Sequence, residues 1–317
     1  MTISRRHAIA GLIGIVPLAA VAQDRSYAIA PVAVAEGLWM IRGADEPMLF
    51  SNGGAIANIA IIATPVGTVL VDAGPSVRYG RALKAAAEAL TGQRVVRVYV
   101  THLHPDHGMG IAAFDPAIVA ALPGTISDME RDSGAFSDAL YRLLGDWMRG
   151  TEVALPGRRI DQPTEDFGGR RIRLLALGGH SRADLALVDE KTGTLIGGDL
   201  LFLDRAPSTP TADIKRWRES LTALAALPHR AAIPGHGPFD PTGHKAIEQT
   251  RDWIGWLEQT LRRAVGAGLD MVEAGELPIP QRFARMAAAR YELQRSVSHL
   301  YPGLEAELLP RVDVDDE

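Results

Sequence analysis

The chain has 317 residues, of which 47% are hydrophobic and 22% are charged, and its formal net charge is −5. This composition is typical of a folded globular protein, and the acidic balance argues against a protein that binds nucleic acid through bulk attraction to phosphate. The absence of cysteine excludes disulfide bonds, thiol nucleophiles, iron–sulfur clusters and every cysteine-ligated metal site.

Residues 1–22 have the pattern of an export signal. Arg5 and Arg6 supply a positive start, an apolar run from Ala8 to Ala20 follows, and Ala20-Val21-Ala22 offers a cleavage site before Gln23. The apolar run is shorter than the roughly 20 residues that a membrane span needs, so we expect no stable span after cleavage. The arginine pair resembles a twin-arginine signal, although ordinary secretion stays open because Ala8 stands where that signal prefers phenylalanine. The predicted location is the periplasm.

The first half of the mature chain is predicted to combine strands with a helix. Its apolar runs are nearly continuous rather than alternating, which favours strands that are covered on both faces. An alanine-rich segment that has Lys84 and Glu88 four residues apart favours a helix. The predicted strands cover residues 39–41, 57–62, 68–72 and 95–100, and the predicted helix covers residues 79–90.

The second half returns to strands after a predicted helical segment over residues 127–148. Its predicted strands cover residues 171–177, 183–188, 194–196 and 231–233, and its predicted helices cover residues 214–227 and most of the chain from Lys245 onward, with breaks at Pro278, Pro280 and Pro302. Two strand-rich halves without a flexible linker predict a layered α/β fold with the helices outside. We expect one domain over residues 23–244, with a helical C-terminal extension over residues 245–317 packed on it. The extension's arginines are predicted to lie on a solvated face; they are Arg282, Arg285, Arg290 and Arg295.

A dense group of metal-ligand residues follows the strand predicted to end at residue 100. His102, His104, Asp106 and His107 lie within six residues, and histidine at this density is typical of metal binding. Imidazole nitrogens suit zinc at neutral pH, and the aspartate adds an oxygen ligand. The segment is therefore predicted to be a loop that supplies metal ligands.

Three further candidate ligands stand beside glycines, in predicted turns that follow strands. They are His180 after Gly178-Gly179, Asp199 after Gly197-Gly198, and His236 between Gly235 and Gly237. Glycine beside a ligand lets the backbone approach a crowded site closely, although each of the three could by itself be an ordinary turn residue. Seven candidates from four strand ends favour two divalent ions that share a bridging carboxylate over one structural zinc.

These seven residues, in this order, resemble the metallo-β-lactamase-fold superfamily over about residues 37–237. The resemblance implies an αββα sandwich with two zinc ions at one edge of the sheets. It implies that His102, His104 and His180 hold one ion, that Asp106, His107 and His236 hold the other, and that Asp199 bridges them; Asp106 and Asp199 are the predicted catalytic residues. Asp72, in Leu70-Val71-Asp72-Ala73-Gly74, matches the superfamily's upstream aspartate and is expected to orient the ligand loop, or alternatively to cap the helix after it.

A narrower likeness lies outside the ligands. Segments such as Ala55-Ile56-Ala57-Asn58 and Leu300-Tyr301-Pro302 resemble exported quinoprotein relay system zinc metallohydrolases (SoxH-like). The resemblance implies a hydrolase that uses a hydroxide bridging two zinc ions on a small ester, lactone, thioester or related bond, with a small-molecule substrate and a periplasmic quinoprotein dehydrogenase system as partners. Two alternatives remain: a metal-stabilised accessory module that docks on a dehydrogenase through the region from Lys245, and a metallo-β-lactamase that acts on β-lactams.

Overall fold

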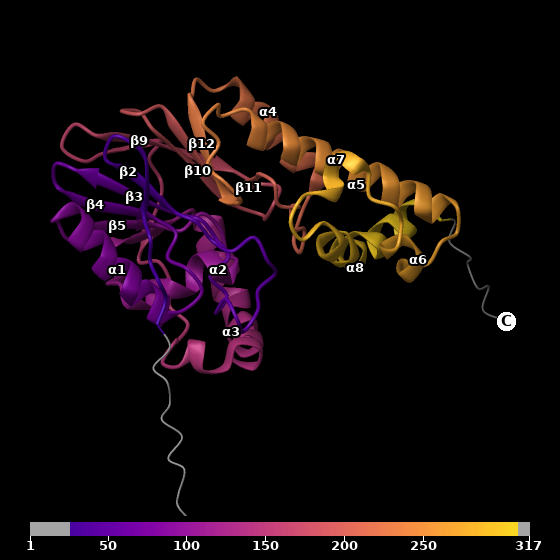
Figure 1. The fold of residues 1–317 in the computed structure, drawn as a ribbon, viewed down its shortest axis with the longest axis horizontal. Helices are drawn as coiled ribbons and strands as arrows, with labels where there is room; N and C mark the ends of the chain where they lie inside the picture. Colours follow the sequence, from indigo (N-terminus) through magenta and orange to yellow (C-terminus); the bar gives the residue numbers. More distant parts are fainter. Residues whose placement is uncertain (1–25, 310–317) are drawn as a thin grey trace, which may run out of the picture.

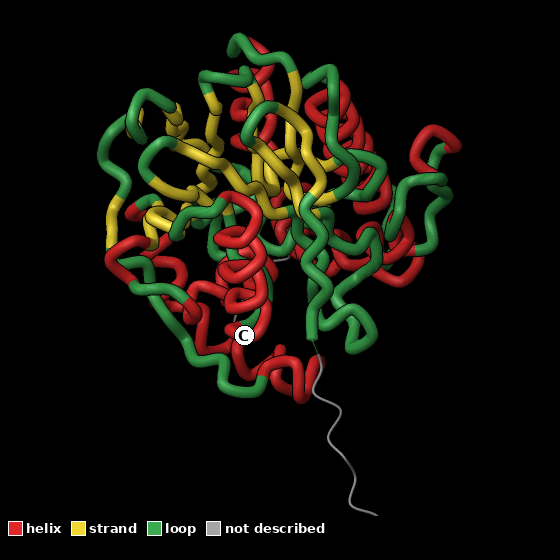
Figure 2. Tube along the Cα trace, turned by 60° about the vertical axis from the view of Figure 1, so that its left-hand side comes forward, coloured by secondary structure: helices red, strands yellow, loops and turns green. Residues whose placement is uncertain are grey.

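The computed structural model describes residues 26–309, in which two β-sheets pack face to face with helices on their outer sides (Figures 1 and 2). The predicted export signal, residues 1–22, lies outside the described residues. Among residues 26–309, no helix combines the length and the apolar character that crossing a membrane requires.

The first sheet has seven strands in sequence order. They are β1 (Val32–Ala35), β2 (Leu38–Ile41), β3 (Ile59–Thr64), β4 (Gly67–Val71), β5 (Val95–Tyr99), β6 (Val119–Ala121) and β7 (Arg158–Arg159). Strands β1 to β4 pair antiparallel, and β4 to β7 pair parallel. The carboxyl ends of β4 and β5 therefore lie at the same edge of the sheet.

The second sheet has five strands, in the spatial order β12-β11-β10-β9-β8. Their bounds are β8 (Thr164–Asp166), β9 (Arg171–Leu177), β10 (Asp184–Asp189), β11 (Thr194–Phe202) and β12 (Ala231–His236). All neighbouring strands pair antiparallel except β11 and β12, which are parallel.

Helices cover the outer face of each sheet (Figure 1). The α-helices are α1 (Val77–Thr91), α2 (Pro105–Gly108), α3 (Pro123–Leu144), α4 (Ile214–Ala226), α5 (Lys245–Gly266), α6 (Met271–Gly275), α7 (Gln281–Ala284) and α8 (Ala289–Leu308), and short 3-10 helices cover Met109–Ala113, Pro116–Ile118 and Gly145–Met148. Helix α1 begins at the cap residue Ser76, whose hydroxyl accepts a hydrogen bond from the Tyr79 amide. It ends at the cap residue Gly92, whose φ of 69° is a left-handed conformation that glycine adopts without strain.

Three apolar clusters hold the layers together, and each fills one space between them. Between the sheets, Ile62 and Val69 pack with Leu187 and Ile233. The outer face of the first sheet packs on α1 and α3 through residues that include Leu70, Leu83 and Met129. The outer face of the second sheet packs on α4 and α5 through residues that include Leu195, Trp217 and Trp253. The order of the layers is the αββα order that the resemblance implied.

The two largest errors in the predicted strand ends both fall at the site. The strand predicted over residues 194–196 continues to Phe202, and the strand predicted over residues 231–233 continues to His236. Parallel pairing of β11 with β12 carries the ladder past the glycines, with register shifts on both sides of Gly198. The glycines that read as turns are therefore irregular points inside paired strands.

The predicted break at Pro302 was also wrong, because Pro302 lies inside α8. The neighbouring residue, Tyr301, is fully buried, and its hydroxyl donates a hydrogen bond to the Leu269 carbonyl. Packing of α8 on α5 and α6 outweighs the hydrogen bond that proline removes from the helix.

Candidate metal centre

A short turn gathers the ligand residues of the first half. After β5, the chain runs through His102 to His104, and helix α2 starts directly at Pro105. Proline is favoured at the first position of a helix, where no amide hydrogen is needed. The turn is closed by hydrogen bonds from the amides of His107 and Gly108 to the His104 carbonyl. The turn thus places His102 and His104 on one side of the site and Asp106 and His107 on the other, although the four residues are close in sequence.

The second sheet supplies the remaining three candidates, one from a loop and two from separate strands. His180 lies in the loop between β9 and β10, Asp199 lies inside β11, and His236 is the last residue of β12. The sequence predicted turns for Asp199 and His236, and the structure places both in strands. Beside Asp199, Gly198 has a φ of 50°, and its own left-handed conformation marks the irregular point in β11.

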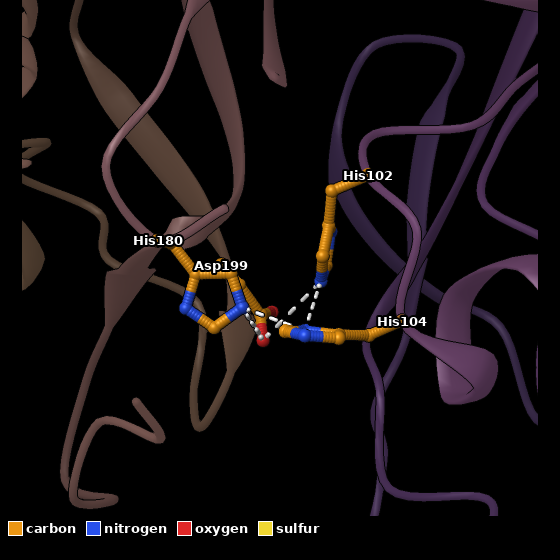
Figure 3. A group of neighbouring side chains, drawn as sticks. All are labelled: His102, His104, His180 and Asp199. Atoms are coloured by element: carbon orange, nitrogen blue, oxygen red, sulfur yellow. Dashed lines mark hydrogen bonds and ion pairs between the residues drawn. The ribbon is translucent and has the colours of Figure 1, made fainter. Parts of the chain in front are cut away.

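The first ligand group consists of His102, His104, His180 and Asp199 (Figure 3). His104 Nδ1 lies 3.0 Å from His102 Nε2 and 2.9 Å from His180 Nε2. Asp199 Oδ2 lies 3.3 Å from His180 Nε2 and 3.8 Å from His102 Nε2. Ligand atoms about 2.0–2.1 Å from a tetrahedral zinc ion lie roughly 3.3 Å from each other, so the observed spacings fit one ion.

The second ligand group consists of Asp106, His107 and His236. Asp106 Oδ2 lies 3.6 Å from His107 Nε2 and 3.4 Å from His236 Nε2. The other oxygen of Asp199, Oδ1, lies 3.0 Å from His107 Nε2 and 3.3 Å from His236 Nε2. One carboxylate therefore presents Oδ2 to the first ligand group and Oδ1 to the second. The two groups fit a dinuclear metal site.

Asp72 supports the site from behind. It follows β4 and has a φ of 67°, a strained conformation for a residue other than glycine. Its Oδ1 accepts a hydrogen bond from the Thr101 amide, and its Oδ2 lies 2.7 Å from His107 Nδ1. This contact aims His107 Nε2 at the metal site. The alternative that Asp72 caps the following helix is wrong, because Ser76 is the cap residue.

Burial keeps three of the histidine ligands uncharged, which suits the binding of cations. All seven candidate ligands are buried, and burial lowers the pKa of His102 and His180 and lowers that of His104 to about 4. These rings are therefore neutral at physiological pH, which is the form that binds metal. Two buried atoms face the shared space, His107 Nε2 and Asp199 Oδ1; they lie 3.0 Å from each other, and neither has a partner with regular hydrogen-bond geometry among the described residues. Buried polar atoms without partners are costly, and a bound cation would satisfy both.

A cavity of about 250 Å³ opens onto the two ligand groups. Asp106, Asp199, His104 and His236 contribute to its lining. Its lining also includes residues that the sequence did not single out as part of the site; they are Met48, Ile56, Phe136, Leu140, Leu143, Arg205, Tyr291 and Glu292.

Arg295, which was predicted to lie on a solvated face of the C-terminal region, has a side chain that is 38% exposed and that also meets the cavity, which the sequence did not predict. Arg295 lines this cavity, because α8 packs beside the metal centre. The amphipathic pattern of α8 showed one apolar and one polar face, and nothing in it indicated that the polar face meets a cavity.

The family model described as the metallo-beta-lactamase superfamily matches residues 52–236, more than half of the chain. The chain belongs to this superfamily, whose members are hydrolases.

Solved structures of similar proteins agree on the fold. A metallo-beta-lactamase from Pontibacter korlensis is 18% identical, with a TM-score of 0.59 over 72% of this chain and 99% of that one. The metallo-beta-lactamase FIM-1 from Pseudomonas aeruginosa, in its mono-zinc form, is 18% identical, with a TM-score of 0.58 over 74% of this chain and 98% of that one. The metallo-beta-lactamase fold, with a C-terminal helical region added to it, is therefore confirmed.

A curated relative, the linear primary-alkylsulfatase of Pseudomonas sp. (strain ATCC 19151), is 21% identical over 265 residues. The match covers 69% of this chain and 49% of the relative, so the chain spans about half the length of that protein.

Proposed function

We propose that the protein is a dizinc hydrolase that cleaves a small ester, lactone, thioester or related bond. The observation that carries the proposal is the placement of Asp199, whose two oxygens face the two ligand groups at 3.0–3.8 Å. A purely structural zinc site would need only four protein ligands around one ion, and no second ligand group beside them. In the proposed site, His102, His104 and His180 hold one ion, Asp106, His107 and His236 hold the other, and Asp199 belongs to both.

Two zinc ions at such a site activate a water molecule for attack and polarise the bond under attack. The residues around the ligand groups position the side chains that this chemistry needs. Asp72 keeps the His107 ring in place, and the turn from His102 to His107 holds its ligand side chains buried at the end of the cavity. Asp106 directs Oδ2 at His107 and His236, so its Oδ1 is the oxygen left to accept a proton from the attacking water.

The direct test is a hydrolysis screen of the zinc-loaded protein. Ester, lactone, thioester, sulfate ester and β-lactam substrates cover the bonds that the site could cleave; the sulfate ester is included because of the alkylsulfatase relative. His102→Ala is the matched control, since it removes one imidazole from the first ligand group. We expect turnover of at least one class by the parent and none by the variant. Metal content close to zero after reconstitution with zinc would refute the proposal.

We also propose that the enzyme is exported to the periplasm and acts beside a quinoprotein dehydrogenase system. The proposal rests on the export pattern of residues 1–22 and on the relay-like segments around residues 55–58 and 300–302. N-terminal sequencing of protein from the periplasm should start at Gln23. A deletion strain would show whether hydrolysis matters there: if His102→Ala restores growth as well as the parent does, the accessory-module alternative is correct and the hydrolase proposal fails.

A further inference from the structure

Helix α8 is tied to the metal-site cavity by buried polar contacts. Arg205, which follows β11, donates a hydrogen bond to Glu292 on α8 over 3.1 Å, and both side chains are almost completely buried. Thr209 donates to Ser296 one turn further along the same helix. Because buried partners are costly to separate, these contacts hold this face of α8 firmly against the cavity.

The same helix brings a cation with spare donors to the cavity. Glu292 neutralises Arg205 at close range, whereas its distance to Arg295 is longer, at 3.6 Å. The Arg295 guanidinium lies over the Tyr291 ring and donates no hydrogen bond to any other residue within 26–309. Its side chain is 38% exposed. Arg295 is thus positioned by its neighbours, and its donors remain available to a ligand.

Most of the rest of the cavity wall is apolar. Phe136, Leu140 and Leu143 line it from α3, and Met48 lines it from the loop after β2. Leu143 and Tyr291 are 47% and 41% exposed, so apolar surface continues outward from the metal centre. A surface of this kind favours a ligand with an apolar segment.

We propose that the substrate is an amphiphilic anion: Arg295 binds its anionic group, and the α3 wall holds its apolar segment while the metal centre acts on the bond to be cleaved. This inference names the substrate class of the proposed hydrolase and rests on that function. Charge-assisted hydrogen bonds from a guanidinium are among the stronger polar contacts, and the apolar surroundings strengthen them further. Helix α8 is therefore part of the substrate site as well as of the fold.

A matched pair of probes tests the charge preference without any turnover. Octanesulfonate carries a negative charge and coordinates divalent metals weakly, and methyl octyl sulfone has the same chain and sulfonyl group without the charge. Binding of each to the zinc-loaded protein is measured by calorimetry. We expect the parent to prefer octanesulfonate by about tenfold or more, and Arg295→Met to lose this preference while it keeps its affinity for the sulfone.

Three further variants make the test specific. Arg285→Met makes the same change in net charge at an exposed residue outside the cavity lining and should leave the preference unchanged. Arg295→Lys should keep part of the preference for octanesulfonate, and Leu143→Ser should lower the affinity for both probes equally. If Arg295→Met does not fold, Arg295→Gln takes its place.

The outcomes separate the two proposals. Equal affinity of the parent for both probes, no binding of either, or an equal loss in Arg285→Met overturns the role of Arg295. A preference that depends on Arg295, in a protein that hydrolyses none of the screened bonds, supports the inference and refutes the hydrolase proposal instead.

Discussion

The two ligand groups share Asp199 and differ in what stands behind their rings. In the second ligand group, His107 Nδ1 lies 2.7 Å from an Asp72 oxygen, and His236 Nδ1 lies 2.9 Å from the Ile56 carbonyl. In the first ligand group, His102 Nδ1 lies 3.0 Å from the Thr101 hydroxyl, His104 Nε2 has a Thr211 hydroxyl at 3.5 Å, and His180 Nδ1 has no partner among the described residues, so no ring of this group has a carboxylate behind it. Partners behind a ring fix its orientation and raise its basicity. We therefore expect the second ligand group to depend more on its surroundings than the first.

The largest effect should come from removing the residue that the two groups share. Asp199→Asn takes a negative charge from both groups at once, so we expect the second metal ion to be lost and hydrolysis to fall by more than the roughly 10–100-fold typical of changes to outer contacts. Elemental analysis and kcat/KM measurements check this. A variant that keeps two ions per chain and most of its activity would show that Asp199 does not bridge.

A smaller but still severe effect is expected from Gly235→Ala. A Cβ atom at residue 235 would overlap Asp199 Oδ1, the oxygen that faces the second ligand group. The nearest neighbour is this carboxylate, and the backbone of Gly198 is also closer than 3.0 Å, so both the side chain of Asp199 and the strand that carries it must shift. We expect selective loss of the ion in the second ligand group, measured as zinc per chain after dialysis. Gly134→Ala is the control: that position in α3 has open space around it, and the variant should keep both ions.

Asp72→Asn tests the stronger outer contact. The amide keeps the size of the side chain and loses its charge, so the His107 ring is held less firmly. We expect zinc affinity at the second ligand group to fall by about 10–100-fold, and zinc affinity at the first ligand group to fall by less, because Asp72 reaches His102 only through the Thr101 hydroxyl. Competition with a chromogenic chelator measures the two steps. Equal weakening of both steps would contradict the proposed difference between the groups.

The smallest effect is expected from Thr211→Val. Its hydroxyl lies 3.5 Å from His104 Nε2, at the limit of a hydrogen bond, and the valine is similar in shape. Zinc affinity at the first ligand group should change by less than about threefold, well below the 10–100-fold expected for a firm outer contact. The same chelator competition, run beside Asp72→Asn, makes the comparison direct. A loss as large as that of Asp72→Asn would show that both groups rely on their outer contacts equally.

The sequence predicted the layers better than it predicted the ends of the strands. Nearly continuous apolar runs such as residues 95–100, which Arg97 alone interrupts, indicate a strand wherever it pairs, and β5 was found for this reason. The strand ends near Asp199 and His236 were missed because Gly198 and Gly235 read locally as turns. Pairing between β11 and β12, which are far apart along the chain, decides where those strands end.

For the site, what could be predicted depended on whether the ligand residues lie close together in the sequence or far apart in it. His102 to His107 were recognisable by themselves, whereas His180, Asp199 and His236 were recognisable only as a set. The structure brings all seven together. Arg295 carried no signal at all, because an arginine on a helical face has the same pattern whether it meets solvent or a cavity.

The ligand atoms come from both sheets: the turn after β5 belongs to the first, and Asp199 and His236 belong to the second. Metal ions held there would bind only the folded chain, so their binding energy would add to its free energy of unfolding. This linkage amounts to about 4 kcal/mol when free metal exceeds the dissociation constant by roughly 1,000-fold. Chelation would then weaken the contact between the two sheets, and the supply of metal would set the stability of the folded protein as well as its activity.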